Sequence, residues 1–210
     1  MSKAIICTGG GAPSSIPSGF VEKDDFVIAA DSGYDTAKRL GIPVHLWVGD
    51  YDSTLFSQEI QQLVHERSPR DKDESDTELA IKKAVSLGYA SYCIIGGGGF
   101  RMDHLFATFS LFEQYGPPEL WYTAYEMVHL VRGYHRFESL KAGRQVSFFP
   151  ASFSRDVYIT AKQLQWPLEN YRLSMDSLSL SNRTTDSFLD VFAKQGGLLF
   201  VSFPVADKLR

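Results

Sequence analysis

Two aspartates, Asp50 and Asp52, lie on either side of Tyr51, one glycine after the apolar stretch 45–48. In an extended backbone, residues two positions apart point to the same side, so both carboxylates face one point. Two anions this close repel each other unless a cation lies between them, and Mg²⁺ prefers such oxygen ligands. The pair therefore predicts a magnesium site, although a solvated turn rich in Asp and Ser explains the spacing equally well.

A second acidic segment, 71–78, reads DKDESDTE. Ser75 and Glu78 form a capping box, which predicts a helix that begins at Asp76. Carboxylates stabilise the first turn of a helix, so part of this acidity needs no function, and Glu78 with Lys82 is a plain surface pair. The cap does not need Asp76, which is therefore a candidate to join the other carboxylates, with a solvated helix start as the alternative.

A glycine-rich segment, 96–104, reads GGGGFRMDH and comes between an apolar run and a helical pattern. Glycines let the backbone approach an anion closely, and Arg101 supplies a planar group that matches phosphate oxygens. Asp103 could cap the helix that follows. The segment predicts a phosphate site, with a flexible hinge as the alternative. An earlier glycine loop, 8–13, fits neither the Walker pattern nor the dinucleotide fingerprint.

The elements that must position these residues alternate between strand and helix up to about residue 115. Apolar runs that break into Gly or Asp predict strands, and periodic segments between them predict helices. Strand–helix alternation indicates a parallel sheet with helices on both faces, where ligands gather at the carboxyl ends of the strands. The predicted strands are 4–7, 26–30, 45–48 and 92–95, and the predicted helices are 34–40, 55–64, 77–87 and about 105–115.

The pattern changes after Gly116-Pro117-Pro118. Apolar runs separated by turn residues follow, with little helical periodicity, and segment 186–194 fits either a helical turn or a strand. We therefore expect an α/β catalytic domain over 1–118 and a smaller antiparallel β-sandwich or barrel over 119–210. The β runs of the second part are 120–131, 145–150, 157–161 and 197–203.

The composition is that of an ordinary globular protein and carries a small net negative charge. Lys and Arg total 21 against 25 Asp and Glu in 210 residues, which argues against nucleic acid as a partner. No leader or membrane-spanning run is expected, and Cys7 and Cys93 lie in apolar runs typical of buried, reduced thiols. These features favour a cytoplasmic protein with no membrane partner.

Taken in order, the segments resemble the thiamine pyrophosphokinase family. The G-D-x-D-S, S-D-T-E and R-x-D-H patterns are specific as a set, although no one of them is specific alone. The matching stretches are 29–33 (AADSG), 48–53 (VGDYDS), 73–78 (DESDTE), 98–104 (GGFRMDH), 164–168 (LQWPL) and 180–182 (LSN).

The resemblance implies a Rossmann-like α/β domain with a β-sandwich domain. It implies transfer of a pyrophosphoryl group from MgATP to the hydroxyl of thiamine, giving thiamine diphosphate and AMP. It also implies a homodimer with the active site at the subunit interface. The site residues it implies are Asp50, Asp52 and Asp76 for Mg²⁺, with Asp31 beside them and Asp103 in support; Gly10, Gly97, Gly98, Gly99, Arg101 and His104 for ATP; and Ser181 and Asn182 for thiamine.

The chain departs from the family pattern at three places. Arg183 replaces a usual Glu, Ser32 replaces a glycine, and Phe100 separates the glycines from Arg101. These departures keep two alternatives open: another Mg²⁺-dependent pyrophosphoryl or nucleotidyl transferase with a different alcohol acceptor, and a binding module without catalysis. The retained carboxylates disfavour the second alternative. The residues leave open which carboxylate takes the proton of the acceptor, with Asp31, Asp52 and Asp76 as the candidates.

Overall fold

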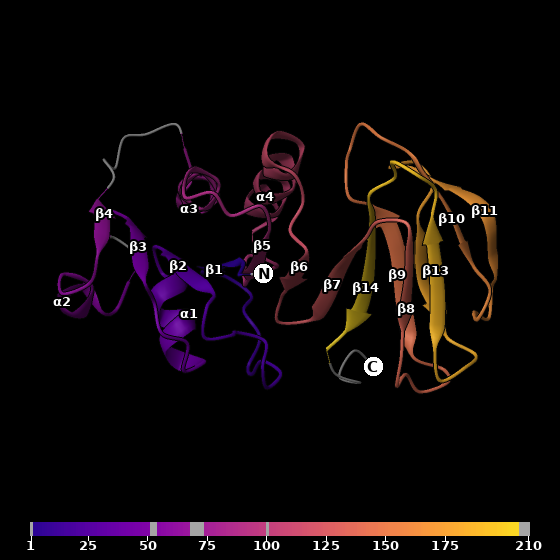
Figure 1. The fold of residues 1–210 in the computed structure, drawn as a ribbon, viewed down its shortest axis with the longest axis horizontal. Helices are drawn as coiled ribbons and strands as arrows, with labels where there is room; N and C mark the ends of the chain where they lie inside the picture. The colour runs from indigo at the N-terminus through magenta and orange to yellow at the C-terminus, as the bar shows by residue number, and fades with distance from the viewer. Residues whose placement is uncertain (1, 51–53, 68–73, 100, 206–210) are drawn as a thin grey trace. The chain divides into compact units, whose positions relative to one another are not determined.

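The protein divides into two compact units, residues 1–125 and 126–210 (Figure 1). The computed structural model describes residues 2–50, 54–67, 74–99 and 101–205. The division lies after Tyr125 rather than near 118, because β6 (Leu120–Tyr122) pairs in parallel with β5 (Tyr92–Ile95) and belongs to the first sheet. The Gly-Pro-Pro segment therefore ends a helix without ending the unit.

The first unit holds a parallel sheet in the order β6-β5-β1-β2-β3-β4. This confirms the predicted parallel sheet. The short edge strand β4 was not predicted, since three residues carry too little pattern to detect. The remaining strands are β1 (Ala4–Thr8), β2 (Phe26–Ala30), β3 (Leu46–Gly49) and β4 (His65–Arg67).

Helices cover both faces of this sheet (Figure 1). They are α1 (Gly33–Arg39), α2 (Ser57–Ile60), α3 (Asp76–Ser86) and α4 (Met102–Tyr115). Alternate residues of β1 face opposite sides: Ile5 and Cys7 pack with Ala37 of α1, whereas Ile6 points to the face on which α3 lies. Both sides of the strand are therefore buried, which explains its unbroken apolar run.

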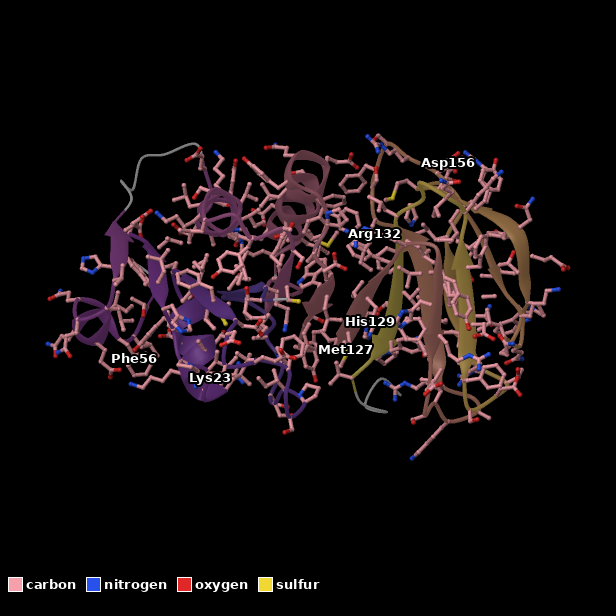
Figure 2. The ribbon with its side chains drawn as sticks, in the orientation of Figure 1. Lys23, Phe56, Met127, His129, Arg132 and Asp156 are labelled. Carbon is pink, nitrogen blue, oxygen red and sulfur yellow. The ribbon has the colours of Figure 1, made fainter. Side chains whose placement is uncertain are left out.

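The helix predicted over 55–64 is wrong in length, because only α2 forms there. Leu55 and Val64 are 85% and 71% exposed, so the apolar residues of this segment do not form one buried stripe. Ile60 alone anchors the turn in the core, and Phe56, labelled in Figure 2, lies 3.8 Å below the Lys38 ammonium group. The chain then continues into β4.

The predicted start of α3 at Asp76 is confirmed. The Ser75 hydroxyl accepts a hydrogen bond from the Glu78 amide at 3.1 Å, and Lys82 lies 3.2 Å from the Glu78 carboxylate. The Tyr115 hydroxyl at the end of α4 also donates to Glu78, at 3.0 Å. Glu78 thus joins α3 to the end of α4.

The second unit is a sandwich of two antiparallel sheets, as expected. One sheet has the order β12-β9-β14-β7 and the other β11-β10-β13-β8. The ambiguous segment 186–194 contains strand β13, and the predicted run 120–131 is divided between β6 and β7. The strands are β7 (Glu126–Val131), β8 (Tyr134–Phe137), β9 (Gln145–Pro150), β10 (Val157–Ala161), β11 (Leu168–Leu173), β12 (Ser179–Arg183), β13 (Leu189–Ala193) and β14 (Leu199–Pro204).

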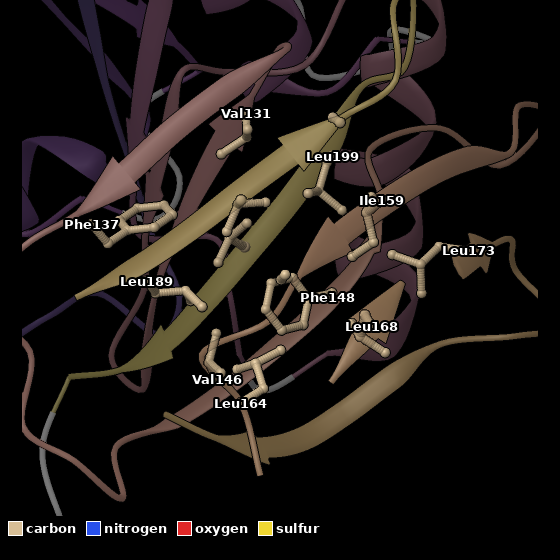
Figure 3. Packing of buried hydrophobic residues seen from close by; sticks show 14 of the residues in the cluster. Val131, Phe137, Val146, Phe148, Ile159, Leu164, Leu168, Leu173, Leu189 and Leu199 are labelled. Atoms are coloured by element: carbon tan, nitrogen blue, oxygen red, sulfur yellow. The ribbon is translucent and has the colours of Figure 1, made fainter. Parts of the chain in front are cut away.

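The core of the sandwich consists of the inward residues of both sheets (Figure 3). Phe148 and Leu189 are fully buried, and each such side chain contributes about 1.5–3 kcal/mol by burial. Strands β8, β11 and β12 were not predicted, because most of their residues are exposed and polar.

Both cysteines are buried free thiols, as predicted, and burial raises the pKa of Cys7 to about 12 and that of Cys93 to about 11. Among the described residues, no helix is long and apolar enough to cross a bilayer.

Candidate active site

The carboxyl ends of three neighbouring strands, β5, β1 and β2, meet at one edge of the first sheet. Thr8 of β1 lies opposite Ala30 of β2, and Cys7 of β1 lies opposite Ile95 of β5. The segments that follow these strands, 9–11, 31–32 and 96–99, therefore leave the sheet side by side. Residues far apart in the sequence are brought together here by strand register alone.

The two glycine loops contact each other directly. The Gly97 amide donates to the carbonyl oxygens of Gly9 at 3.0 Å and Gly10 at 2.6 Å. Gly97 has a φ of 72° and Gly10 a φ of 70°, a region that residues with a Cβ rarely adopt. Because the Gly97 N–H is used between the loops, this glycine shapes the site and does not offer its amide to an anion.

Asp31 follows β2 in a strained backbone conformation, with a φ of 47°. Its amide donates to the Val48 carbonyl at 2.8 Å, and its own carbonyl accepts from the Trp47 indole and the Tyr34 amide, each at 3.1 Å. These three hydrogen bonds hold the main chain in place. A strained aspartate fixed at the end of a strand is a recurrent feature of functional sites.

The ends of two helices complete a cavity of about 400 Å³ at this edge. The start of α3 contributes Asp76, and one face of α4 contributes His104 and Thr108 together with Arg101 just before the helix. The full lining is Thr8, Gly9, Gly10, Ala30, Asp31, Ser32, Ser75, Asp76, Thr77, Gly97, Gly99, Arg101, His104 and Thr108.

Arg101 is held by Asp103 in an exposed ion pair. The guanidinium donates from Nε at 3.1 Å and from Nη2 at 2.5 Å to the two carboxylate oxygens. The hydrogen bonds from Arg101 lower the pKa of Asp103 to about 2, and the same pair raises the pKa of Arg101. The expectation that Asp103 caps α4 is wrong, because Arg101 occupies the cap position and Asp103 lies inside the first turn.

The structure brings most of the predicted nucleotide residues together and leaves others apart. Asp31, Asp76, Gly10, Gly97, Gly99, Arg101 and His104 all line the cavity. Gly98, Asp50 and Asp103 are described but do not line it. Asp52 lies outside the described residues. Within the described ranges, no three His, Cys, Asp or Glu side chains form a group that could hold a metal ion.

The two predicted thiamine residues lie in β12 of the second unit and differ in exposure. Asn182 is buried, and its amide oxygen accepts from the amides of Trp166 at 3.2 Å and Arg183 at 2.8 Å, while its amide nitrogen donates to the Trp166 carbonyl at 2.8 Å. Ser181 is exposed, with a φ of 55°. Asn182 therefore fixes the main chain at Trp166, whereas Ser181, like Leu180 and Arg183 of the same strand, is exposed to solvent.

Sequence reasoning missed the hydroxyls that line the cavity. Thr108 comes one helical turn after His104, so helix periodicity could have placed both on one face. Thr8 and Ser32 follow from strand register and loop shape, which leave no pattern in the sequence. The unpredicted lining residues with hydroxyls are Thr8, Ser32, Ser75, Thr77 and Thr108.

A glycine-walled cavity with two carboxylates and an arginine, on an α/β unit followed by a β-sandwich, defines a two-domain enzyme of the phosphoryl-transfer class. Comparison with known families narrows the class. Residues 18–119 match the model of the thiamin pyrophosphokinase catalytic domain, and residues 134–195 match that of the thiamin pyrophosphokinase vitamin B1 binding domain. The chain belongs to the thiamine pyrophosphokinase family, whose members transfer the pyrophosphoryl group of ATP to thiamine.

Individual relatives agree with the family match. Thiamine pyrophosphokinase of Bacillus subtilis (strain 168) is 26% identical over 200 residues, covering 88% of this chain and 91% of the relative. The crystal structure of the Bacillus subtilis enzyme has a TM-score of 0.76 at 21% identity, over 98% of this chain and 100% of that one. The yeast enzyme has a TM-score of 0.69 at 12% identity, over 99% of this chain and 88% of that one. The fold is shared along nearly the whole chain.

Proposed function

We propose that the cavity of the first unit binds the polyphosphate of MgATP and that the chain transfers the pyrophosphoryl group to the hydroxyl of thiamine. One observation carries this proposal: Asp31, Asp76 and Arg101 lie around a single cavity at the carboxyl end of the sheet, between two glycine loops. Ligands of such sheets bind in this position. The cytoplasmic location expected from the sequence stays a prediction.

The donor set suits a magnesium ion. Asp31 and Asp76 supply carboxylate oxygens at the cavity, and Mg²⁺ typically takes one or two carboxylates and completes its shell with water and substrate phosphates. We assign these two residues, with the sequence-predicted Asp50 and Asp52, to holding the metal. When bound, the ion neutralises charge that develops on the phosphate oxygens.

The residues of the chain then act mainly by placement. The glycine loops let the nucleotide approach closely, and Arg101 offers a planar pair of donors to phosphate oxygens. Attack of the thiamine hydroxyl on the β-phosphorus forms one P–O bond and breaks the bond to the departing AMP, so negative charge shifts to AMP. Fixed donors aimed at that charge supply most of the catalysis in such reactions.

One carboxylate at the cavity could take the proton of the thiamine hydroxyl. Asp31 and Asp76 both line the cavity, and a base must lie within hydrogen-bond reach of the proton that it removes. The main chain of Asp31 is held in place through its bonds to Val48, Trp47 and Tyr34. Asp52 lies outside the described residues and remains a third candidate from the sequence.

We assign thiamine to the second unit, at the segment formed by Ser181 and Asn182 and the loop at Trp166. Support comes from the match of residues 134–195 to the vitamin B1 binding domain and from the exposure of Ser181. Trp166 is 56% exposed, although its main chain is held at both N–H and carbonyl by Asn182.

The decisive test is the identity of the nucleotide product. The purified chain with ATP, Mg²⁺ and thiamine is expected to release AMP, in an amount equal to the thiamine diphosphate formed. Release of ADP would overturn pyrophosphoryl transfer. AMP release that requires an alcohol other than thiamine would instead support the alternative acceptor, which the Arg183 departure motivated.

The proposal includes a homodimer whose active sites form between subunits. Its support is the family resemblance, and it can be tested by complementation. Coexpressed Asp76→Asn and Asn182→Ala chains would form mixed dimers with one intact site, which add about a quarter of wild-type activity at low thiamine to the residual activity of the Asn182→Ala homodimers. A site built within one subunit would give only that residual activity.

A further inference from the structure

Ser32 stands in the cavity where the family pattern has a glycine. It follows Asp31 at the end of β2, and its side chain rests on the first glycine loop. A Cβ added to Gly9 would overlap the Ser32 hydroxyl oxygen and would lie 3.3 Å from the Ser32 Cβ. The hydroxyl therefore occupies the space directly above Gly9, inside the wall of the proposed phosphate site.

Within the part of the chain that the structure describes, the Ser32 hydroxyl takes no part in holding the fold. Although Ser32 is the cap residue of α1, its side chain makes no capping hydrogen bond, and its φ of −62° and ψ of −2° are those of a helix. Its main-chain carbonyl carries the local structure, accepting from the Asp35 amide at 3.1 Å. No hydrogen bond of the Ser32 side chain occurs among the described residues, whereas the Thr8 and Thr36 hydroxyls beside it both donate to carbonyl oxygens.

A half-buried hydroxyl without a protein partner retains its full capacity to bind a ligand. At this position the neighbouring wall consists of Gly9 and Gly10, which have no side chains to offer. The Asp31 carboxylate, which also lines the cavity, is an acceptor and is assigned to the metal. Neither neighbour therefore offers a side-chain donor to a ligand. A phosphate oxygen bound in this part of the cavity would find its side-chain donor in the Ser32 hydroxyl.

We propose that Ser32 is a binding residue for the polyphosphate, its hydroxyl donating a hydrogen bond to a non-bridging phosphate oxygen of the nucleotide. The proposal rests on the proposed function, because it takes the cavity as the ATP site. It adds a chain-specific contact: a serine here supplies a donor that the glycine of the family pattern cannot. The consequence is tighter binding of the triphosphate without any change in thiamine binding.

The first experiment measures binding of two ligands to Ser32→Ala and Ser32→Gly by calorimetry with Mg²⁺ and without thiamine. Both variants are expected to bind α,β-methylene-ATP and inorganic tripolyphosphate about tenfold more weakly than wild type, the effect of losing one hydrogen bond to a charged group. Ser14→Ala, at an exposed serine outside the cavity lining, is the matched control and is expected to bind both normally.

Steady-state kinetics of the same variants show whether the Ser32 contact is made to ATP or to thiamine. The KM for ATP is expected to rise with little change in the KM for thiamine. Unchanged affinity for both phosphate ligands, or a rise confined to the KM for thiamine, would overturn the proposal while leaving AMP release intact. Failure of wild-type chain to release AMP with thiamine would instead overturn the proposed function, and tripolyphosphate binding would still report on Ser32.

The second experiment tests the placement of the side chain against Gly9. Gly9→Ala alone is expected to weaken binding of α,β-methylene-ATP about as much as Ser32→Ala does, since the new methyl group displaces the Ser32 hydroxyl from its position above Gly9. In the Ser32→Gly background the nearest remaining atom is 3.9 Å away, an ordinary contact, so Gly9→Ala should bind as well as Ser32→Gly alone. Equal loss from Gly9→Ala in both backgrounds would show that Ser32 does not lie where we place it.

Discussion

The two units position their functional residues by different means. In the first unit, the cavity edge is built from main chain: strand register aligns the loops, and the Gly97 amide binds the carbonyls of Gly9 and Gly10. In the second unit, a side chain does this task, because the Asn182 amide holds the main chain at Trp166 through both its N–H and its carbonyl. A site built from main chain requires residues small enough for close backbone approach. A site held by one side chain, here the Asn182 clamp on the Trp166 main chain, requires a residue with the correct hydrogen-bonding groups.

This difference explains which substitutions each unit can tolerate. In the first unit, an added methyl group meets the backbone: a Cβ on Gly33 would overlap the Cys7 carbonyl oxygen. In the second unit, removal of a group is the hazard, because buried polar atoms of the main chain lose their partner. The following predictions test the contrast, beginning with the chemistry that the first unit is proposed to carry.

The largest effect is expected from Asp76→Asn, which removes a cavity carboxylate without changing its size. Turnover should fall by about 10²–10³, typical of losing a preorganised electrostatic group, with thermal stability unchanged. The control is Asp156→Asn, which breaks an exposed ion pair with Arg172 of 2.7 Å. Near-normal turnover in the Asp76→Asn variant would show that the Asp76 carboxylate takes no part in the reaction.

Gly33→Ala tests whether the first unit depends on close main-chain approach. Overlap with the Cys7 carbonyl must displace α1 from β1, so we expect a loss of about 3 kcal/mol in the free energy of unfolding. Gly88→Ala is the matched control: its φ is 84° and no atom lies within 4 Å, so only backbone strain of about 1 kcal/mol applies. Urea unfolding of both variants measures the difference, and equal losses would contradict the close approach.

Asn182→Ala tests the clamp in the second unit. Removing a buried amide that makes three hydrogen bonds should cost about 2 kcal/mol in stability and raise the KM for thiamine several-fold, with the KM for ATP unchanged. Asn182→Asp retains the two acceptor contacts and should keep more of both properties. If the KM for thiamine stays at the wild-type value in both variants, Asn182 does not contribute to thiamine binding.

The smallest effect concerns pH and His129 on β7. Burial, with a smaller contribution from His135, lowers the pKa of His129 from its ordinary 6.5 to about 4. Between these values the unfolded chain binds a proton that the folded chain does not, so stability falls as the pH drops from about 6.5 to about 4. By about pH 5.5, one unit below the ordinary pKa, the expected loss from this group is about 1–2 kcal/mol.

His129→Gln should reduce the slope of stability against pH over this range, besides a constant cost from lost contacts with Phe137 and Phe203. In the first unit, the stability contributed by Asp25 also falls in acid. Burial raises the pKa of Asp25, but hydrogen bonds from Lys3 and from the Glu22 amide outweigh burial and lower it, so this stabilisation is lost when acid protonates the carboxylate. An unchanged slope in the His129 variant would show that this ring is not desolvated.

Much of the first unit could be predicted from the sequence because its signals are local. Apolar runs that end in glycine and aspartate gave the strands, and the Ser75–Glu78 box gave the start of α3. Segment 55–64 was misjudged because its apolar residues satisfy helix periodicity without a core to cover, as the exposure of Leu55 shows. The exposed strands β11 and β12 contain too few apolar residues to give a strand pattern in the sequence.

The sequence by itself determined the class of fold, the acidic and glycine-rich segments and the family, because residue order and type carry these directly. Tertiary structure alone decided which of those segments share a cavity, that Gly97 uses its amide between loops, and that Asn182 is a buried clamp. It also placed Ser32 above Gly9. The physical reason is that hydrogen-bond partners and empty space depend on strand register and packing between distant residues, which no local pattern encodes.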